Sequence, residues 1–142
     1  HLISFEDKVK ALNEAKRVVK DNGYIFISYY INDYAIMKHG FIDKNIKSAF
    51  EKGNVNEEFH VVSKENDLYS FVTMEEIDKL KNECKLVREK IISQDGLTDY
   101  FRREINSLDE EEFKLYLKYH FSICEKYEFL GTSSHVMDIL IK

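Results

Sequence analysis

The 142-residue chain is long enough for one domain, and its hydrophobic content of 44%, with 13% aromatic residues, suffices for a packed core. Its 21 basic and 26 acidic side chains give a formal charge of -5, which argues against nucleic acid or an anionic membrane as a partner because both need a basic face. No run approaches the ~18 apolar residues of a membrane span, and the first residues lack the layout of a signal peptide.

The most informative stretch is an amphipathic helix followed by an apolar strand. Ser4 can cap a helix whose apolar side chains recur on one face as far as Val19. Gly23 then ends the helical region, and residues 24–31 are almost uniformly apolar. Such a strand is typical of the middle of a parallel sheet, with both faces covered. Nothing upstream supplies its neighbours, so we expect the chain, which opens on His1, to begin inside a domain.

The next forty residues form a less regular region. Residues 32–34 are turn-like, and a broken helical pattern divided by Gly40 continues to about residue 52. Two short apolar segments, 59–62 and 68–72, flank a polar stretch, and this pattern predicts a β-hairpin.

The rest of the chain alternates helices and strands. Thr73 and Glu76 form a capping box that opens a short helix, residues 85–93 read as a strand, and residues 97–105 are helical. A second capping box at 107–110 starts a long helix, and residues 131–134 turn into a closing strand at 135–141. The long helix carries an apolar stripe of Phe113, Tyr116, Leu117, His120, Cys124 and Tyr127. No repeat or linker divides the chain, which indicates a single domain.

Composition also indicates the cellular setting. Cys84 and Cys124 lack the spacing of a metal or redox motif, so we expect two buried thiols in a cytoplasmic protein. Proline is absent, while Lys, Ile and Asn are frequent, a composition typical of an AT-rich bacterial genome.

Four short motifs occur in an order that one enzyme family shares. Residues 1–3 are similar to the end of a Tyr-His-Leu loop, and residues 15–23 to a helix that ends in a Lys-Pro-Gly-Gly-like turn. Residues 70–77 resemble an aromatic-x-Thr-Pro-Glu-Glu-Ile segment, with Met74 in place of proline, and residues 130–136 resemble a Gly-x-Ser-x-His stretch. Together they resemble the C-terminal half of bacterial class I S-adenosylmethionine-dependent methyltransferases.

The resemblance implies an α/β fold, the C-terminal part of a Rossmann-like methyltransferase sheet. Residues 24–31 would be the fifth strand, and the last strand would lie antiparallel between the fifth and the sixth. Residues 1–142 would form a partial methyltransferase domain, with 34–72 as an insertion or lid and the cofactor-binding half absent. The five glycines make no Gly-x-Gly turn, so we do not expect this segment alone to bind S-adenosylmethionine or to be active. The parent protein would transfer a methyl group from that cofactor to a small-molecule acceptor.

Candidate site residues follow the expected fifth strand, because ligands in open α/β sheets bind beyond the carboxyl ends of the strands. Tyr30, Asn32, Asp33 and Tyr34 are expected to contact the acceptor, and Asp33 or Tyr34 could assist a proton transfer. The alternative is that Tyr30 is packed and that Asn32 and Asp33 cap the next helix. His1 borders the cofactor side by resemblance, although it is equally a chain terminus. No pair of histidines or carboxylates has zinc-type spacing, so we expect no metal.

The remaining histidines and aromatic residues have plainer interpretations. We expect His120 to be a hydrogen-bonded core histidine and His135 to hold the loop at Gly131, whereas His39 and His60 have no identifiable partners. The aromatic residues of 34–72 line an acceptor pocket or form the core of the insertion.

A second function is compatible with the same pattern. The chain would then be a non-catalytic α+β interaction domain, self-contained and dimeric. Under both interpretations residues 24–31 present an open strand edge, which predicts self-association or domain swapping.

Overall fold

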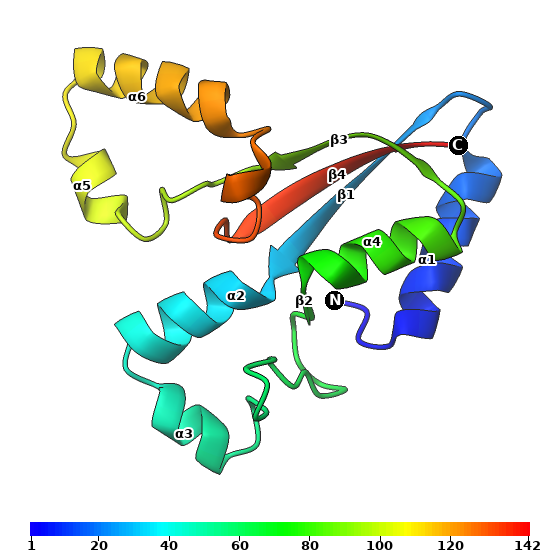
Figure 1. Ribbon diagram of the computed structural model, residues 1–142, viewed down its shortest axis with the longest axis horizontal. Helices are drawn as coiled ribbons and strands as arrows, with labels where there is room; N and C mark the ends of the chain where they lie inside the picture. The colour runs from blue at the N-terminus through cyan, green and yellow to red at the C-terminus, as the bar shows by residue number, and fades with distance from the viewer.

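The computed structural model describes residues 1–142 as helices arranged around a four-stranded sheet (Figure 1). The strands are β1 (Tyr24–Ile31), β2 (Phe71–Val72), β3 (Val87–Ser93) and β4 (His135–Ile141). The α-helices are α1 (Phe5–Val18), α2 (Asn32–Ala35), α3 (Ile46–Glu51), α4 (Met74–Glu83), α5 (Arg102–Asn106) and α6 (Glu110–Ile123). A π-helix, η1 (Ile36–Ile42), continues α2, and a 3-10 turn, η2 (Tyr127–Phe129), follows α6.

The sheet is mixed, with strand order β2-β1-β4-β3. The last strand, β4, lies antiparallel between β1 and β3, and its register with β1 runs from Tyr24 opposite Ile141 to Tyr30 opposite His135. The two-residue β2 runs parallel to β1 and pairs only with Tyr30 and Ile31. The predicted α/β class is therefore confirmed.

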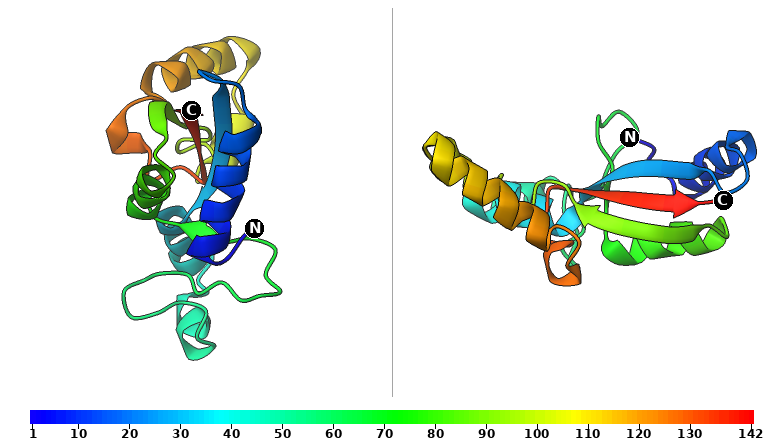
Figure 2. Two further views of the ribbon diagram at one scale, coloured as in Figure 1. Left: turned by 90° about the vertical axis from the view of Figure 1, so that its right-hand side faces the viewer. Right: turned by 90° about the horizontal axis from the view of Figure 1, so that it is seen from above.

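One face of the sheet carries the core. Helices α1 and α4 lie side by side on this face, and Lys16 Nζ of α1 donates hydrogen bonds to the carbonyls of Cys84 and Lys85 behind α4 (Figures 1 and 2). Burying each leucine or isoleucine contributes about 1.5–3 kcal/mol. The buried side chains that the helices and strands contribute to this core include Leu12, Ile25, Tyr29, Ile31, Tyr34, Val72, Ile77, Leu80, Val136 and Leu140.

No helix covers the opposite face of the sheet. The right panel of Figure 2 looks onto it, and on β1 it presents Tyr24 and Phe26, which are 53% and 62% exposed. The prediction that both faces of residues 24–31 are covered is therefore wrong, because the burial of β1 alternates along the strand. The open edge is present, since Tyr24–Tyr29 have no strand partner on the side of β2.

Local signals placed several elements correctly. Ser4 caps α1 by accepting a hydrogen bond from the Asp7 amide, and Thr73 with Glu76 forms a reciprocal capping box at α4. The strands predicted at 24–31 and 135–141 match β1 and β4, and the one predicted at 85–93 begins at Val87.

The predicted β-hairpin does not form. Residues 59–62 are held instead by residues 54–56, through a bridge between Val55 and Val61, while Phe71 and Val72 pair with β1. The side chain of Asn32 also holds this loop. It donates a hydrogen bond to the Phe59 carbonyl at 3.0 Å and accepts one from the Val61 amide at 2.8 Å.

The predicted turn at residues 32–34 is wrong, because α2 begins directly at Asn32, whose side chain makes these tertiary bonds rather than a local turn. Gly40 does not divide the helical region either. It is buried within η1, where an added Cβ would lie 3.1 Å from Ile46 Cδ1, and the break comes at Lys44, which has a φ of 60°.

The long helix also differs from its prediction. Residues 97–101 form turns before α5, and the N-cap of α6 is Asp109 in a box with Glu112, whereas Ser107 closes α5. No residue of the expected apolar stripe is fully buried, because α6 extends away from the sheet and buries only Ile123 (Figure 2). His120 is correspondingly half-buried against Tyr116 and has no hydrogen-bond partner.

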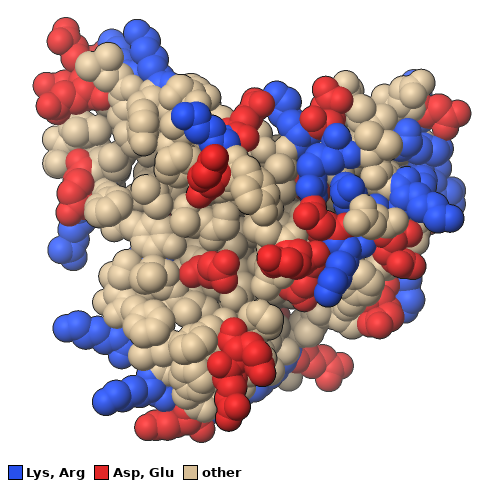
Figure 3. Space-filling view, in the orientation of Figure 1, with Lys and Arg blue, Asp and Glu red and all other residues tan.

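The surface carries charged side chains of both signs, and the two cysteines are free. Basic and acidic side chains are intermixed on the visible face, around a broad uncharged area (Figure 3). None of the helices combines the length and apolar character needed to cross a lipid bilayer. Cys84 is buried as expected, Cys124 is only partly buried, and both are free thiols.

Candidate functional site

An aromatic cluster forms at the carboxyl end of β1. The ring of Tyr30 stacks on His135 at 4.7 Å between centroids and lies 4.5 Å from Phe71 and 5.9 Å from Tyr34. Three elements meet here because β4 and β2 flank the end of β1 and α2 starts at the next residue. Burial raises the pKa of Tyr30, so its phenol stays protonated near neutral pH.

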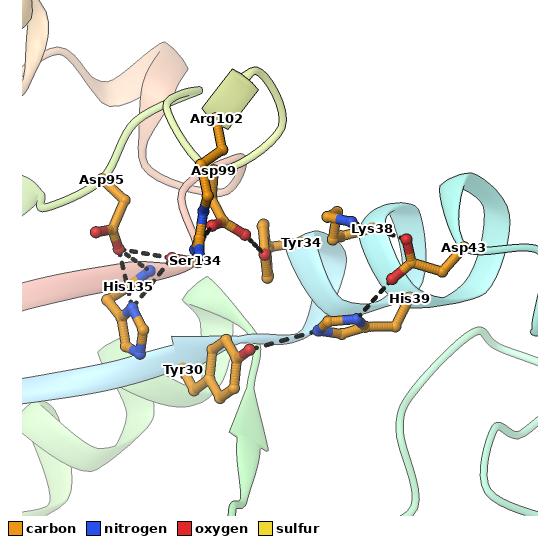
Figure 4. Close-up of polar contacts among 10 residues, drawn as sticks. All are labelled: Tyr30, Tyr34, Lys38, His39, Asp43, Asp95, Asp99, Arg102, Ser134 and His135. Carbon is orange, nitrogen blue, oxygen red and sulfur yellow. Dashed lines mark hydrogen bonds and ion pairs between the residues drawn. The ribbon is translucent and has the colours of Figure 1, made fainter. Parts of the chain in front are cut away.

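The π-helix brings a histidine into this cluster. His39 Nε2 lies 3.5 Å from the Tyr30 hydroxyl, and His39 Nδ1 lies 3.1 Å from Asp43 Oδ2 (Figure 4). Hydrogen bonds from Lys38 and His39 lower the pKa of the Asp43 carboxyl. Short π-helical segments are frequent at functional sites, because the extra residue per turn redirects side chains.

A second histidine is fixed by a carboxylate on the neighbouring loop. Asp95 Oδ2 lies 2.9 Å from His135 Nδ1 and also accepts hydrogen bonds from the Ser134 hydroxyl at 2.6 Å and the His135 amide at 3.1 Å (Figure 4). The contact exists because β3 and β4 are antiparallel neighbours, which places the residues after β3 beside the start of β4. A carboxylate at Nδ1 favours the tautomer with its proton there, which leaves Nε2 with a free lone pair.

Behind the cluster, a buried tyrosine is bonded to a carboxylate. Tyr34 donates a hydrogen bond to Asp99, which also accepts one from Arg102 (Figure 4). Burial and this hydrogen bond raise the pKa of Tyr34, so its phenol stays neutral. Burial of Asp99 acts in the opposite direction, but the bonds from Tyr34 and Arg102 lower the pKa of its carboxyl below the usual value.

A cavity of about 350 Å³ opens beside this cluster, between α1 and the unpaired edge of β1. Its aromatic wall contains Tyr30 and Tyr69, and His135 and Lys8 are also exposed to it. Lys8 Nζ donates to Ser70 Oγ at 2.9 Å and to the Ile3 carbonyl at 3.1 Å, and burial lowers the pKa of this lysine. The cavity is of the size expected for a small ligand and has apolar walls with few polar groups.

The structure separates the four predicted acceptor residues. Tyr30 and Tyr34 lie together in the cluster, whereas Asn32 is buried and holds the 59–61 loop. Asp33 is exposed and points to a different hollow, which it shares with Tyr100. Of the two groups suggested for proton transfer, Tyr34 is bonded to Asp99 and Asp33 lies outside the main cavity.

Sequence reasoning missed both pairs of histidine and aspartate. His39 had no assigned partner, and His135, which holds the Gly131 loop through Ser133 and Ser134 as expected, also binds Asp95, which was not expected. The strand order contains the signal for the second pair, because a last strand inserted beside the 85–93 strand brings residue 95 next to residue 135. The first pair depends on the π-helical path of residues 36–42, for which the sequence carries no comparable signal.

The residue expected on the cofactor side, His1, lies at the main cavity. No Gly-x-Gly turn accompanies it, and the cavity lies along the unpaired edge of β1. No group of three or more histidine, cysteine or acidic side chains is arranged to hold a metal ion.

Comparison with known proteins adds no relative. No protein-family model matches the chain, and no curated protein matches it.

Proposed function

We propose that this chain is the acceptor-side part of an S-adenosylmethionine-dependent methyltransferase that acts on a small molecule. The observation that carries the proposal is the position of β4, antiparallel between β1 and β3. The family resemblance requires this arrangement for its fifth, seventh and sixth strands. The short sequence motifs do not specify this strand order, so the observed order is support independent of them.

The uncovered parts of the sheet support the same proposal. Six residues of β1 lack a partner on one edge, and Phe26 and Tyr24 are exposed on the open face. A soluble domain rarely leaves a row of apolar side chains beside an open strand edge unless another element covers them. A cofactor-binding half, with its own strands and helices, would cover these side chains on the open face.

The position of the cavity agrees with acceptor binding. It borders Tyr30 at the carboxyl end of β1, where open α/β sheets bind their ligands. Methyl transfer is a displacement in which the protein positions and desolvates the nucleophile, and an apolar cavity with a few polar groups suits that task.

The test is cofactor binding by the protein encoded in the full reading frame around this segment. Calorimetry with S-adenosylmethionine should show saturable binding to that protein and none to residues 1–142 alone, which serve as the matched control. The proposal fails if the full reading frame encodes no Gly-x-Gly turn upstream of His1, or if its product does not bind the cofactor.

The alternative is a non-catalytic interaction domain. The exposed side chains of Tyr24 and Phe26 on β1 favour this alternative, because apolar side chains on a strand with a free edge can pair with a second chain. A stable dimer of residues 1–142 that buries these side chains, from a reading frame without a cofactor-binding half, would support the alternative and exclude the methyltransferase.

A further inference from the structure

We propose that His135 is a proton acceptor for a small phenol bound in the cavity beside Tyr30. The proposal names the substrate class of the proposed methyltransferase and rests on it for its biological role. The proton transfer itself needs no methyl donor, so it can be measured independently.

The first observation is the orientation of the imidazole. Asp95 Oδ2 contacts Nδ1 of His135 and accepts a hydrogen bond from the His135 amide. The Ser134 hydroxyl also contacts Nδ1 and donates a hydrogen bond to the same carboxylate oxygen. Nε2 has no partner in the protein and points away from Asp95 in Figure 4. A histidine held by a carboxylate through one nitrogen and free at the other is the arrangement of a general base.

The second observation is that this ring lies at a cavity suited to a planar ligand. His135, Tyr30 and Tyr69 line one part of the cavity, and apolar side chains of α1, including Leu12, line another. An aromatic ring can pack against these rings, which favours planar ligands over flexible ones.

The third observation is an ammonium that lines the same cavity. Lys8 uses its ammonium to bond Ser70 and Ile3, and an ammonium has three N–H groups, so one remains for a ligand oxygen. An ammonium and an imidazole that line one apolar cavity favour a weak acid that gives up its proton.

The proton balance is simple. The phenol O–H bond breaks, its proton forms an N–H bond with His135 Nε2, and the electron pair stays on the phenolate oxygen. The phenolate is the better nucleophile, and the imidazolium is stabilised by Asp95. Asp95 is therefore a positioning residue. Asp95 and Tyr30 contact this imidazole, and the other titratable groups that line the cavity are Tyr69, His1 and Lys8.

The test uses residues 1–142 with 4-nitrophenol, whose ionised form absorbs visible light. At a pH where the free probe is mostly protonated, saturating protein should raise the visible absorbance several-fold. His135→Gln should abolish this rise while binding, measured by calorimetry, remains. The matched control is His60→Gln, an exposed histidine outside the cavity, which should behave as the unmodified chain.

A second measurement guards against a variant that fails to fold. Nitrogen-15 NMR of the unmodified chain should show that His135 holds its proton on Nδ1 alone and gains one on Nε2 when the probe binds. The inference is overturned if the probe does not bind, binds without ionising, or ionises equally with His135→Gln. If the probe ionises as expected but the full-length product does not bind S-adenosylmethionine, the methyltransferase proposal fails and the proton acceptor stands.

Discussion

The ion pair between Arg88 and Asp138 should be the most sensitive point of this fold. Asp138 is fully buried in the middle of β4, where its neighbours across the sheet are Ile27 and Ile91. Its two oxygens accept hydrogen bonds from Arg88 Nε and Nη2, both at 2.7 Å, and Arg88 also reaches Asp78 at 2.5 Å. These bonds raise the pKa of the guanidinium, and the hydrogen bonds that Arg88 donates to Asp138 are the largest cause.

Removing the two partners should have unequal effects. Arg88→Met leaves a carboxylate without a counter-charge in the interior, which costs about 3–5 kcal/mol. Asp138→Asn removes a charge but keeps a hydrogen-bonding group, and Arg88 keeps Asp78, so the loss should be about 1–3 kcal/mol.

Urea denaturation followed by far-ultraviolet circular dichroism measures these losses. With a slope on the order of 2 kcal/mol per M, Arg88→Met should lower the midpoint by about 1.5–2.5 M. Arg17→Met is the matched control, because the pair of Arg17 with Glu14 is exposed, and its midpoint should not change. If Arg88→Met shifts the midpoint no further than Arg17→Met does, the assignment of Asp138 as a buried, paired carboxylate is refuted.

Three further outcomes are expected. Thr73→Ala should lower the free energy of unfolding by about 1 kcal/mol, because it removes the cap of α4, and an unchanged urea midpoint would contradict the role of the cap. The pKa of Asp99 is lower in the folded state, so its contribution to stability is complete above about pH 4 and is lost as the pH falls through the lowered value. Asp99→Asn should remove this part of the acid sensitivity in midpoints measured over a pH series, and an unchanged pH dependence would count against it. Finally, Phe26→Lys should reduce self-association of residues 1–142 in sedimentation velocity without lowering the urea midpoint, whereas a strictly monomeric unmodified chain at high concentration would contradict the open-edge argument.

The sequence by itself determined the elements whose signals are local. Ser4 and Thr73 mark helix starts because a cap is a hydrogen bond to an amide three residues away. The apolar run at 24–31 marks β1, and the pattern at 135–141 marks β4, because strand formation needs only a few adjacent side chains of the right type.

Only the tertiary structure decided the candidate site and the failed predictions. Asp95 meets His135 across 40 residues because β3 and β4 pair, and the sequence motifs alone do not specify which strands pair. Asn32 was expected in a turn, but its side chain binds a loop 27 to 29 residues away. This long-range contact holds residues 59–61 where the sequence predicted the first strand of a hairpin. The apolar pattern of residues 24–31 also did not predict which face of β1 is buried. Such a pattern indicates which side chains are apolar, but not whether this chain supplies a surface that packs on both faces of the strand.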